Sequence, residues 1–150
     1  MSTARDVDQR QSAAKMALKI KRDHERAGQL ALEALALFGD LDATDEQRGD
    51  LAHSLAGLFR DLGDLERCEP LAVQAIEREA ALAEPRPLIL ATRHLFHAKL
   101  LYDLRRFGEA AHHARTGLAI YETGIAGDHP ELARVREHVA AIVAGVPQPS

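Results

Sequence analysis

Aromatic and β-branched residues are scarce in this 150-residue sequence. Tryptophan is absent, aromatic residues make up only 4% of the chain, and valine, isoleucine and threonine together occupy only 17 positions. Because β-strands favour these residue types, their scarcity argues against a β-sandwich or a β-barrel.

A basic excess, paired cysteines and long apolar runs are also missing. The formal net charge is −4 and the isoelectric point is about 6.0, which argues against a nucleic-acid-binding protein. Cys68 is the only cysteine, so no intramolecular disulfide can form and an oxidising compartment is not indicated. No apolar run approaches the ~20 residues of a membrane span, and residues 1–6 lack the apolar core of a signal peptide. We therefore expect a cytoplasmic protein that does not contact membranes.

Alanine and leucine, in contrast, are abundant, with 27 and 21 positions. Both residues rank high on helix-propensity scales, and the 46% of apolar residues is enough to bury a core. Apolar residues recur at spacings of three and four, as in Leu51, Leu55, Leu58, Phe59 and Leu62. The sequence therefore predicts an all-α protein.

The predicted helices repeat along the chain. A shift of 42 residues aligns identical residues: Leu58 with Leu100, Asp61 with Asp103, Ala56 with Ala98 and Ala72 with Ala114. A weaker copy lies 41 residues before the first of these units, and repeats of this length predict stacked helix pairs. The expected layout is a flexible N-terminus at 1–7, one repeat domain at 8–144 and a flexible tail at 145–150, with helix pairs at 8–40, 44–84 and 87–124 and a capping helix at 130–144. No glycine or proline marks the turn of the first pair near Arg22, so one long helix remains an alternative there.

These residues carry a family resemblance. The segment 100–111 (LLYDLRRFGEAA) resembles a tetratricopeptide repeat (TPR), and 55–71 follows the same pattern. The segment 127–133 (GDHPELA) looks like the link between the 42-residue repeats of kinesin light chains. The resemblance covers residues 44–144 and, more weakly, 8–40. It implies a right-handed superhelical stack of about three antiparallel helix pairs with a C-terminal capping helix.

The resemblance also accounts for the placement of small residues. The two helices of a TPR pair cross closely, and small residues occupy the expected crossing positions: Ala56 with Cys68, and Ala98 with Ala110. The sequence departs from the family pattern where an aromatic residue, a leucine or a turn glycine is usual: Ala52, His94, His97 and Arg105.

No catalytic or nucleotide-binding motif is present. The chain has no GxxxxGK or GxGxxG run and no nucleophile elbow, and Cys68 at a helix crossing is expected to be a small buried hydrophobe. His94 and His97 lie one helical turn apart, and His112 and His113 could approach from the neighbouring helix. Because no cysteine pair or HExxH pattern accompanies them, a metal-dependent sensor is the least favoured alternative. We expect that the protein is not an enzyme and that it binds neither a cofactor nor a metal ion.

A TPR stack binds a peptide or partner protein on the concave surface formed by the first helix of each pair. The repeat register places seven residues on that surface: His53, Arg60, Asp61, Leu95, Lys99, Tyr102 and Asp103. Arg60 and Lys99, with Lys19 as a third candidate, suit a carboxylate of the partner. The chain has no asparagine, so the Lys/Asn/Arg clamp of some family members is absent in its usual form. The resemblance thus implies a non-catalytic adaptor or scaffold, although these residues also fit an ordinary solvated helix face.

An assembly subunit is the second functional hypothesis. The end faces of a short repeat stack often pack on another chain, and the nearly charge-free segment 140–146 is a candidate docking surface for a homo-oligomer or a larger complex. The same segment also fits a role in capping the core.

Overall fold

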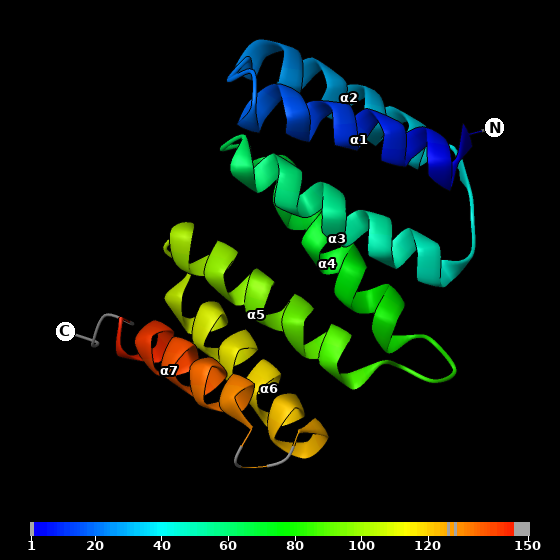
Figure 1. Ribbon diagram of the computed structural model, residues 1–150. Helices are drawn as coiled ribbons and strands as arrows, with labels where there is room; N and C mark the ends of the chain where they lie inside the picture. The colour runs from blue at the N-terminus through cyan, green and yellow to red at the C-terminus, as the bar shows by residue number, and fades with distance from the viewer. Residues whose placement is uncertain (1, 126, 128, 146–150) are drawn as a thin grey trace. The chain divides into compact units, whose positions relative to one another are not determined.

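The computed structural model describes residues 2–125, 127 and 129–145. These residues form seven α-helices and two short strands (Figure 1). In chain order the elements are β1 (Ser2–Thr3), α1 (Ala4–Lys19), α2 (His24–Gly39), β2 (Leu41–Asp42), α3 (Asp45–Asp61), α4 (Leu65–Ala80), α5 (Pro87–Asp103), α6 (Phe107–Gly124) and α7 (Pro130–Ala144). The expected all-α class is therefore confirmed.

The chain divides into two compact units. Unit 1 ends at Leu82 and contains α1 to α4, and unit 2 begins at Ala83 and contains α5 to α7.

Unit 1 consists of two antiparallel helix pairs, α1 with α2 and α3 with α4 (Figure 1). The alternative of one long N-terminal helix is excluded, because α1 ends at Lys19 and α2 begins at His24. Helix α1 also packs against α3. The two first helices of the pairs therefore lie side by side within unit 1.

The segment 2–7 differs from the flexible N-terminus that the sequence suggested. Strand β1 pairs in parallel with β2, with Ser2 opposite Leu41, and the Ser2 hydroxyl donates a hydrogen bond to the Asp40 carbonyl at 3.0 Å. Helix α1 begins at Ala4, and Val7 is fully buried. A strand of two residues shows no alternating pattern, so sequence periodicity could not reveal it.

Side chains at the helix N-termini satisfy backbone groups that would otherwise lack partners. Helix α3 begins with a capping box: the Thr44 hydroxyl accepts from the Gln47 N–H at 3.2 Å, and the Thr44 N–H donates to the Gln47 side chain at 3.1 Å. Asp64 caps α4, since its side chain accepts from the Arg67 N–H at 3.2 Å. Thr3 forms a further capping box at the start of α1.

The turn inside each helix pair has the same backbone geometry. One residue of each turn has a positive φ: Arg22 at 52°, Gly63 at 79° and Arg105 at 61°. These positions are 41 and 42 residues apart, which matches the repeat lengths found in the sequence. The next residue in each turn donates its N–H back to a carbonyl near the end of the preceding helix, at 2.8 to 2.9 Å. The three pairs therefore share one turn type, even though only one of them carries glycine.

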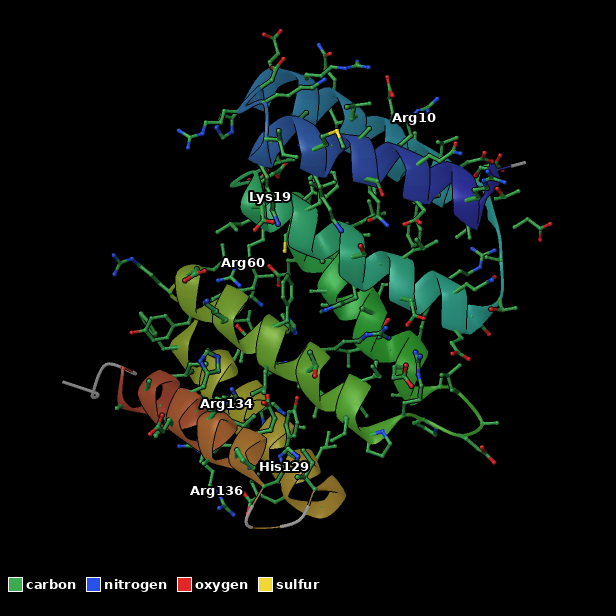
Figure 2. The ribbon with its side chains drawn as sticks, in the orientation of Figure 1. Arg10, Lys19, Arg60, His129, Arg134 and Arg136 are labelled. Atoms are coloured by element: carbon green, nitrogen blue, oxygen red, sulfur yellow. The ribbon has the colours of Figure 1, made fainter. Side chains whose placement is uncertain are left out.

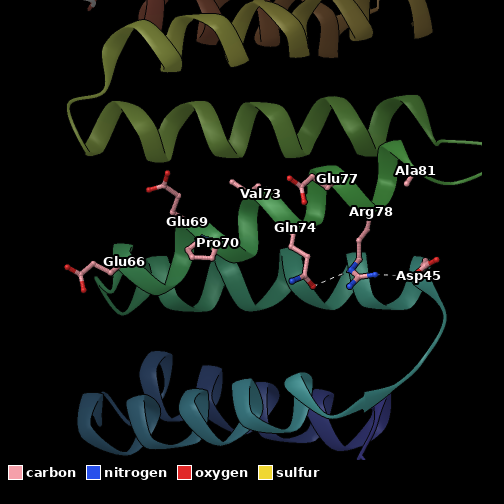
Figure 3. A pocket seen from close by; sticks show the side chains of 9 residues that line it. All are labelled: Asp45, Glu66, Glu69, Pro70, Val73, Gln74, Glu77, Arg78 and Ala81. Carbon is pink, nitrogen blue, oxygen red and sulfur yellow. Dashed lines mark hydrogen bonds and ion pairs between the residues drawn. The ribbon is translucent and has the colours of Figure 1, made fainter.

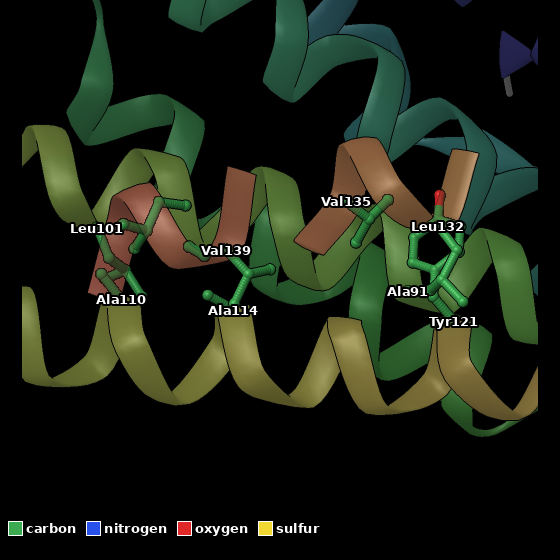
Figure 4. Packing of buried hydrophobic residues seen from close by; sticks show 10 residues of the cluster. Ala91, Leu101, Ala110, Ala114, Tyr121, Leu132, Val135 and Val139 are labelled. Atoms are coloured by element: carbon green, nitrogen blue, oxygen red, sulfur yellow. The ribbon is translucent and has the colours of Figure 1, made fainter. Parts of the chain in front are cut away.

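The core of unit 2 lies between α5, α6 and α7 (Figure 4). Small residues line the crossing of α5 and α6, where Ala98 and Ala110 are both fully buried as expected. Helix α7 covers this crossing with a buried stripe made of Leu132, Val135, Val139 and Ile142. Small residues let the two helices approach, and the larger aliphatic residues of α7 fill the remaining space.

The equivalent crossing in unit 1 also uses small side chains. Ala56 and Cys68 are both fully buried. Burial raises the pKa of the Cys68 thiol to about 12, so the reactive thiolate is not formed at neutral pH. Cys68 is therefore a buried hydrophobe, as its position in the sequence indicates.

Helix α7 begins and ends where the sequence predicts, at Pro130 and Ala144. The His129 ring accepts a hydrogen bond from the Glu131 N–H at 3.1 Å and caps the helix. The part of the expected tail from 146 to 150 lies outside the described residues. Within the part of the chain that the structure describes, no helix is both long enough and apolar enough to span a bilayer.

Candidate partner-binding surfaces

A chain of polar side chains links the two first helices of unit 1. The Gln11 amide donates to Asp8 at 2.8 Å and accepts from the Ser54 hydroxyl at 2.8 Å. The Lys15 ammonium donates to the same hydroxyl at 3.3 Å. These bonds connect α1 to α3, so they hold the shared face of the two helices in register.

The cationic positions predicted for this surface lie at one end of unit 1. Lys19 is exposed at the C-terminal end of α1, and Arg60 is partly exposed at the same end of α3 (Figure 2). The two residues are 41 positions apart, so they occupy equivalent places in successive repeats. His53 is partly exposed on α3, and Asp61 is exposed beside Arg60.

Two exposed apolar side chains accompany these cations. Met16 is 53% exposed and Ile20 is 74% exposed at the C-terminal end of α1. By the 41-residue register they correspond to Gly57 and Asp61 of α3, and Asp61 is one of the seven residues that the sequence places on the concave surface. This end of unit 1 therefore combines positive charge with apolar contact area, a combination typical of binding surfaces.

A shallow groove opens at the opposite end of the α1–α3 face. Its volume is about 320 Å³, and it is lined by Ala4, Arg5, Asp8, Gln47, Asp50 and Leu51. The sequence did not single out these residues, because the predicted surface positions lie in the middle and at the C-terminal end of each first helix. The repeat register could have identified Asp50, which lies one helical turn before His53 on α3.

In unit 2 the four predicted surface residues have two different roles. Leu95 and Tyr102 pack against the buried core. The Tyr102 ring also meets Phe107 edge to face, with centroids 5.1 Å apart. Lys99 and Asp103 are exposed on α5. Of the four residues, Lys99 and Asp103 therefore form the polar surface of α5. Leu95 and Tyr102 contribute mainly to the stability of the fold.

Four histidines gather where α5 meets α6. The Nδ1 atoms of His94 and His113 are 3.0 Å apart, so one ring must donate and the other accept. The His113 ring also lies 4.4 Å from the His97 ring and 5.4 Å from the His112 ring, measured between centroids. The structure thus brings together the four rings that the sequence singled out.

The rings of His94 and His113 form a hydrogen-bonded imidazole pair. Within the described residues, no group of three or more His, Cys, Asp or Glu side chains could hold a metal ion. The two rings are stacked with an angle of 26° between their planes, and their Nδ1 atoms point toward each other. Burial, followed by the neighbouring His113 and His112, lowers the pKa of His94 to about 4, and burial also lowers the pKa of His113.

The segment proposed as an end-face docking surface belongs largely to the α7 cap. Ile142 is buried and Val143 packs against the core of unit 2. Ala140, Ala141 and Ala144 are exposed, and Val146 lies outside the described residues. The apolar side chains of this segment therefore serve the core, and only alanines remain on its outer face.

No protein-family model and no curated protein matches the sequence. Solved structures do match. The crystal structure of BtubC (BKLC) from P. vanneervenii has a TM-score of 0.71 and 18% identity over 93% of this chain. Two structures of a Podosopora anserina putative kinesin light chain with nearly identical TPR-like repeats, one of them a variant, each have a TM-score of 0.76 and 16% identity over 97% and 95% of this chain.

The match in fold is therefore extensive although identity is low. This chain spans 57% of the BtubC chain and 70% and 68% of the two P. anserina chains. The similarity extends over the first helix pair, where the sequence pattern was weakest. The three pairs share one turn geometry and cross closely at small residues, as in a helical-repeat stack. Together with the structural matches, these features show that the chain has a TPR-like helical-repeat fold.

Proposed function

We propose that the chain is a non-catalytic interaction module that binds a peptide or a segment of a partner protein on the first helices of its pairs. The observation that carries this proposal is the exposed end of the α1–α3 face. There Lys19 and Arg60 occupy equivalent repeat positions, next to the exposed side chains of Met16 and Ile20.

The chemistry of this surface favours a partner with both a carboxylate and an apolar side chain. Lysine and arginine donate charge-assisted hydrogen bonds to carboxylates. The side chains of Met16 and Ile20 expose apolar area to water. Covering this area with a partner's apolar side chain is favourable because it removes apolar surface from water. Lys99 of unit 2 is a further cation on the first helix of its pair, and Asp103 beside it disfavours a second acidic group at that position.

A peptide array tests the proposal. The purified full-length chain is applied to peptides that vary in acidic content and that end in a free carboxylate. We expect it to bind peptides that combine an acidic group with an apolar side chain. In the double variant Arg60→Glu/Lys99→Glu, affinity for those peptides should fall at least about tenfold, because two favourable charges become repulsive.

Glu137→Lys is the matched control, since it changes the charge of an exposed residue on α7, which is not the first helix of any pair. It should bind like the unchanged chain, and far-UV circular dichroism should show equal helix content in all three proteins. The proposal fails if no peptide binds, or if the double variant retains the affinity of the unchanged chain.

A further inference from the structure

The largest groove described on unit 1 runs along α4 and does not include the surface proposed above. Its volume is about 820 Å³ (Figure 3). Apart from Asp45 at the start of α3, its lining comes from α4 and the residue after it: Glu66, Glu69, Pro70, Val73, Gln74, Glu77, Arg78 and Ala81. One side of a single helix therefore supplies most of this groove.

Carboxylates outnumber cations along the groove. Glu66 and Glu77 are exposed toward its two ends. Arg78 is the single cation of the lining, and its guanidinium already contacts the Asp45 carboxylate at 3.0 Å and the Gln74 amide oxygen at 3.3 Å. Because Arg78 is held by its own neighbours, the charge presented to a visiting molecule is negative.

Apolar and backbone groups lie between these carboxylates. Val73 is partly exposed, and Pro70 is exposed one turn before it. Proline has no N–H, so Pro70 cannot donate to the Glu66 carbonyl as other residues at this helical position would. The groove therefore offers an apolar centre, two acidic ends and a backbone acceptor near Glu66.

The spacing of these groups matches one face of a second helix. Glu66, Val73 and Glu77 follow each other at intervals of seven and four residues, which keeps them on one stripe of α4. At 1.5 Å per residue, Glu66 and Glu77 are separated by ~16 Å along the helix axis. An incoming helix with two cations about three turns apart and apolar residues between them would complement this stripe.

We propose that the groove on α4 is a second docking surface, which binds a basic amphipathic helix of a partner protein. Arginine or lysine side chains of the partner would pair with Glu66 and Glu77, while an apolar side chain between them covers Val73 and Pro70. The inference goes beyond the proposed function because it uses a different helix and selects the opposite charge in the partner.

Fluorescence anisotropy with a defined probe tests this surface on the full-length chain. The probe is a fluorescein-labelled, alanine-based helical peptide of about 18 residues, with two arginines about three turns apart and leucines between them on the same face. The chain should bind this peptide, and higher salt should weaken binding because the contacts are charged. A peptide with glutamates in place of the arginines should not bind.

Two kinds of variant separate charge from apolar contact. Glu66→Lys/Glu77→Lys reverses the charge at both ends of the groove and should weaken binding at least about tenfold. Val73→Asp places a charge in the apolar centre and should weaken it as well. Glu137→Lys again serves as the control for charge alone and should bind the probe normally, with circular dichroism confirming that every variant is folded.

The proposal is overturned if the arginine peptide does not bind, if the glutamate peptide binds equally well, or if Glu66→Lys/Glu77→Lys keeps normal affinity. Arg60→Glu/Lys99→Glu should leave this probe's affinity unchanged. Failure of the α4 surface and failure of the surface on the first helices are thus distinguishable.

Discussion

Two arginines, Arg22 and Arg105, occupy a backbone conformation that usually belongs to glycine. Their φ values are 52° and 61°, close to the 79° of Gly63 in the equivalent turn. For a residue with a Cβ atom this left-handed conformation costs roughly 1–2 kcal/mol. The fold therefore tolerates strain in two of its three intra-pair turns.

Relieving this strain should stabilise the protein. Arg105 is exposed, so Arg105→Gly removes little packing, and we expect the free energy of unfolding to rise by about 1 kcal/mol. The reverse substitution, Gly63→Ala, should lower it by a similar amount. A Cβ at Gly63 would meet no atom within 4 Å, so the loss would report backbone strain alone. Urea unfolding of both variants measures the effect, and an equal stability of all three proteins would contradict the shared turn geometry.

The histidine pair makes stability depend on pH. The pKa of His94 falls from its usual 6.5 to about 4, chiefly because the ring is buried and secondarily because His113 and His112 are close. In the unfolded chain the His94 ring takes up a proton near pH 6.5, whereas in the folded chain it does so only near pH 4. Since the unfolded state binds more protons in this interval, the free energy of unfolding should decrease as pH falls from about 6.5 to 4.

Urea unfolding across that pH range tests the role of His94. His94→Gln removes one titrating ring and should flatten the loss of stability at acid pH, although His113 keeps part of it because its pKa is also lowered. His24→Gln, a change at an exposed residue of α2, should follow the unchanged chain. If the free energy of unfolding depends on pH in the same way for His94→Gln and for the unchanged chain, titration of His94 does not cause the loss of stability at acid pH.

At the scale of the elements, Gly117 of α6 lies close against α5. A Cβ atom there would lie 3.0 Å from the Leu95 side chain and 3.1 Å from the Ala91 carbonyl oxygen. Leu95 could shift, but the backbone carbonyl of a helix cannot do so without moving the helix. The absence of a side chain at Gly117 thus sets the distance between the two helices.

Gly117→Ala should therefore destabilise the chain, even though alanine is the better helix former by about 1 kcal/mol. Gly28→Ala is the matched control: Gly28 is also helical, and a Cβ there would meet nothing within 4 Å, so this change should stabilise the chain. Thermal unfolding followed by circular dichroism compares the two. If the melting temperature rises in both variants, the space between α5 and α6 at Gly117 accommodates a Cβ atom, and the close packing proposed there is wrong.

Much of the element structure was predictable from local sequence. Thr44 and Gln47 form a capping box, and Pro87 and Pro130 occupy first-turn positions, so α3, α5 and α7 begin where local chemistry indicates. The turn at Arg22 could not be decided in the same way, because the residue carries no preference for a positive φ. There, tertiary contacts impose a conformation that the residue itself disfavours.

At the scale of the whole molecule, the sequence predicted the repeat but only part of the candidate site. The repeat register locates first-helix positions, and it placed Lys19 and Arg60 in equivalent positions on one face. It could not reveal that Leu95 packs against Gly117, since that contact depends on how closely two helices approach. It also gave no indication of the groove on α4, because scattered glutamates are typical of any solvated helix.

The proposed interaction places a partner segment on the first helices of the pairs. Amide NMR spectra of the ¹⁵N-labelled full-length chain, titrated with the tightest acidic peptide from the array, test it most directly. We expect saturable shifts concentrated on α1, α3 and α5, including the amides of Lys19, Arg60 and Lys99. Shifts confined to α2 and α6, or no saturable shifts at all, would contradict the claim.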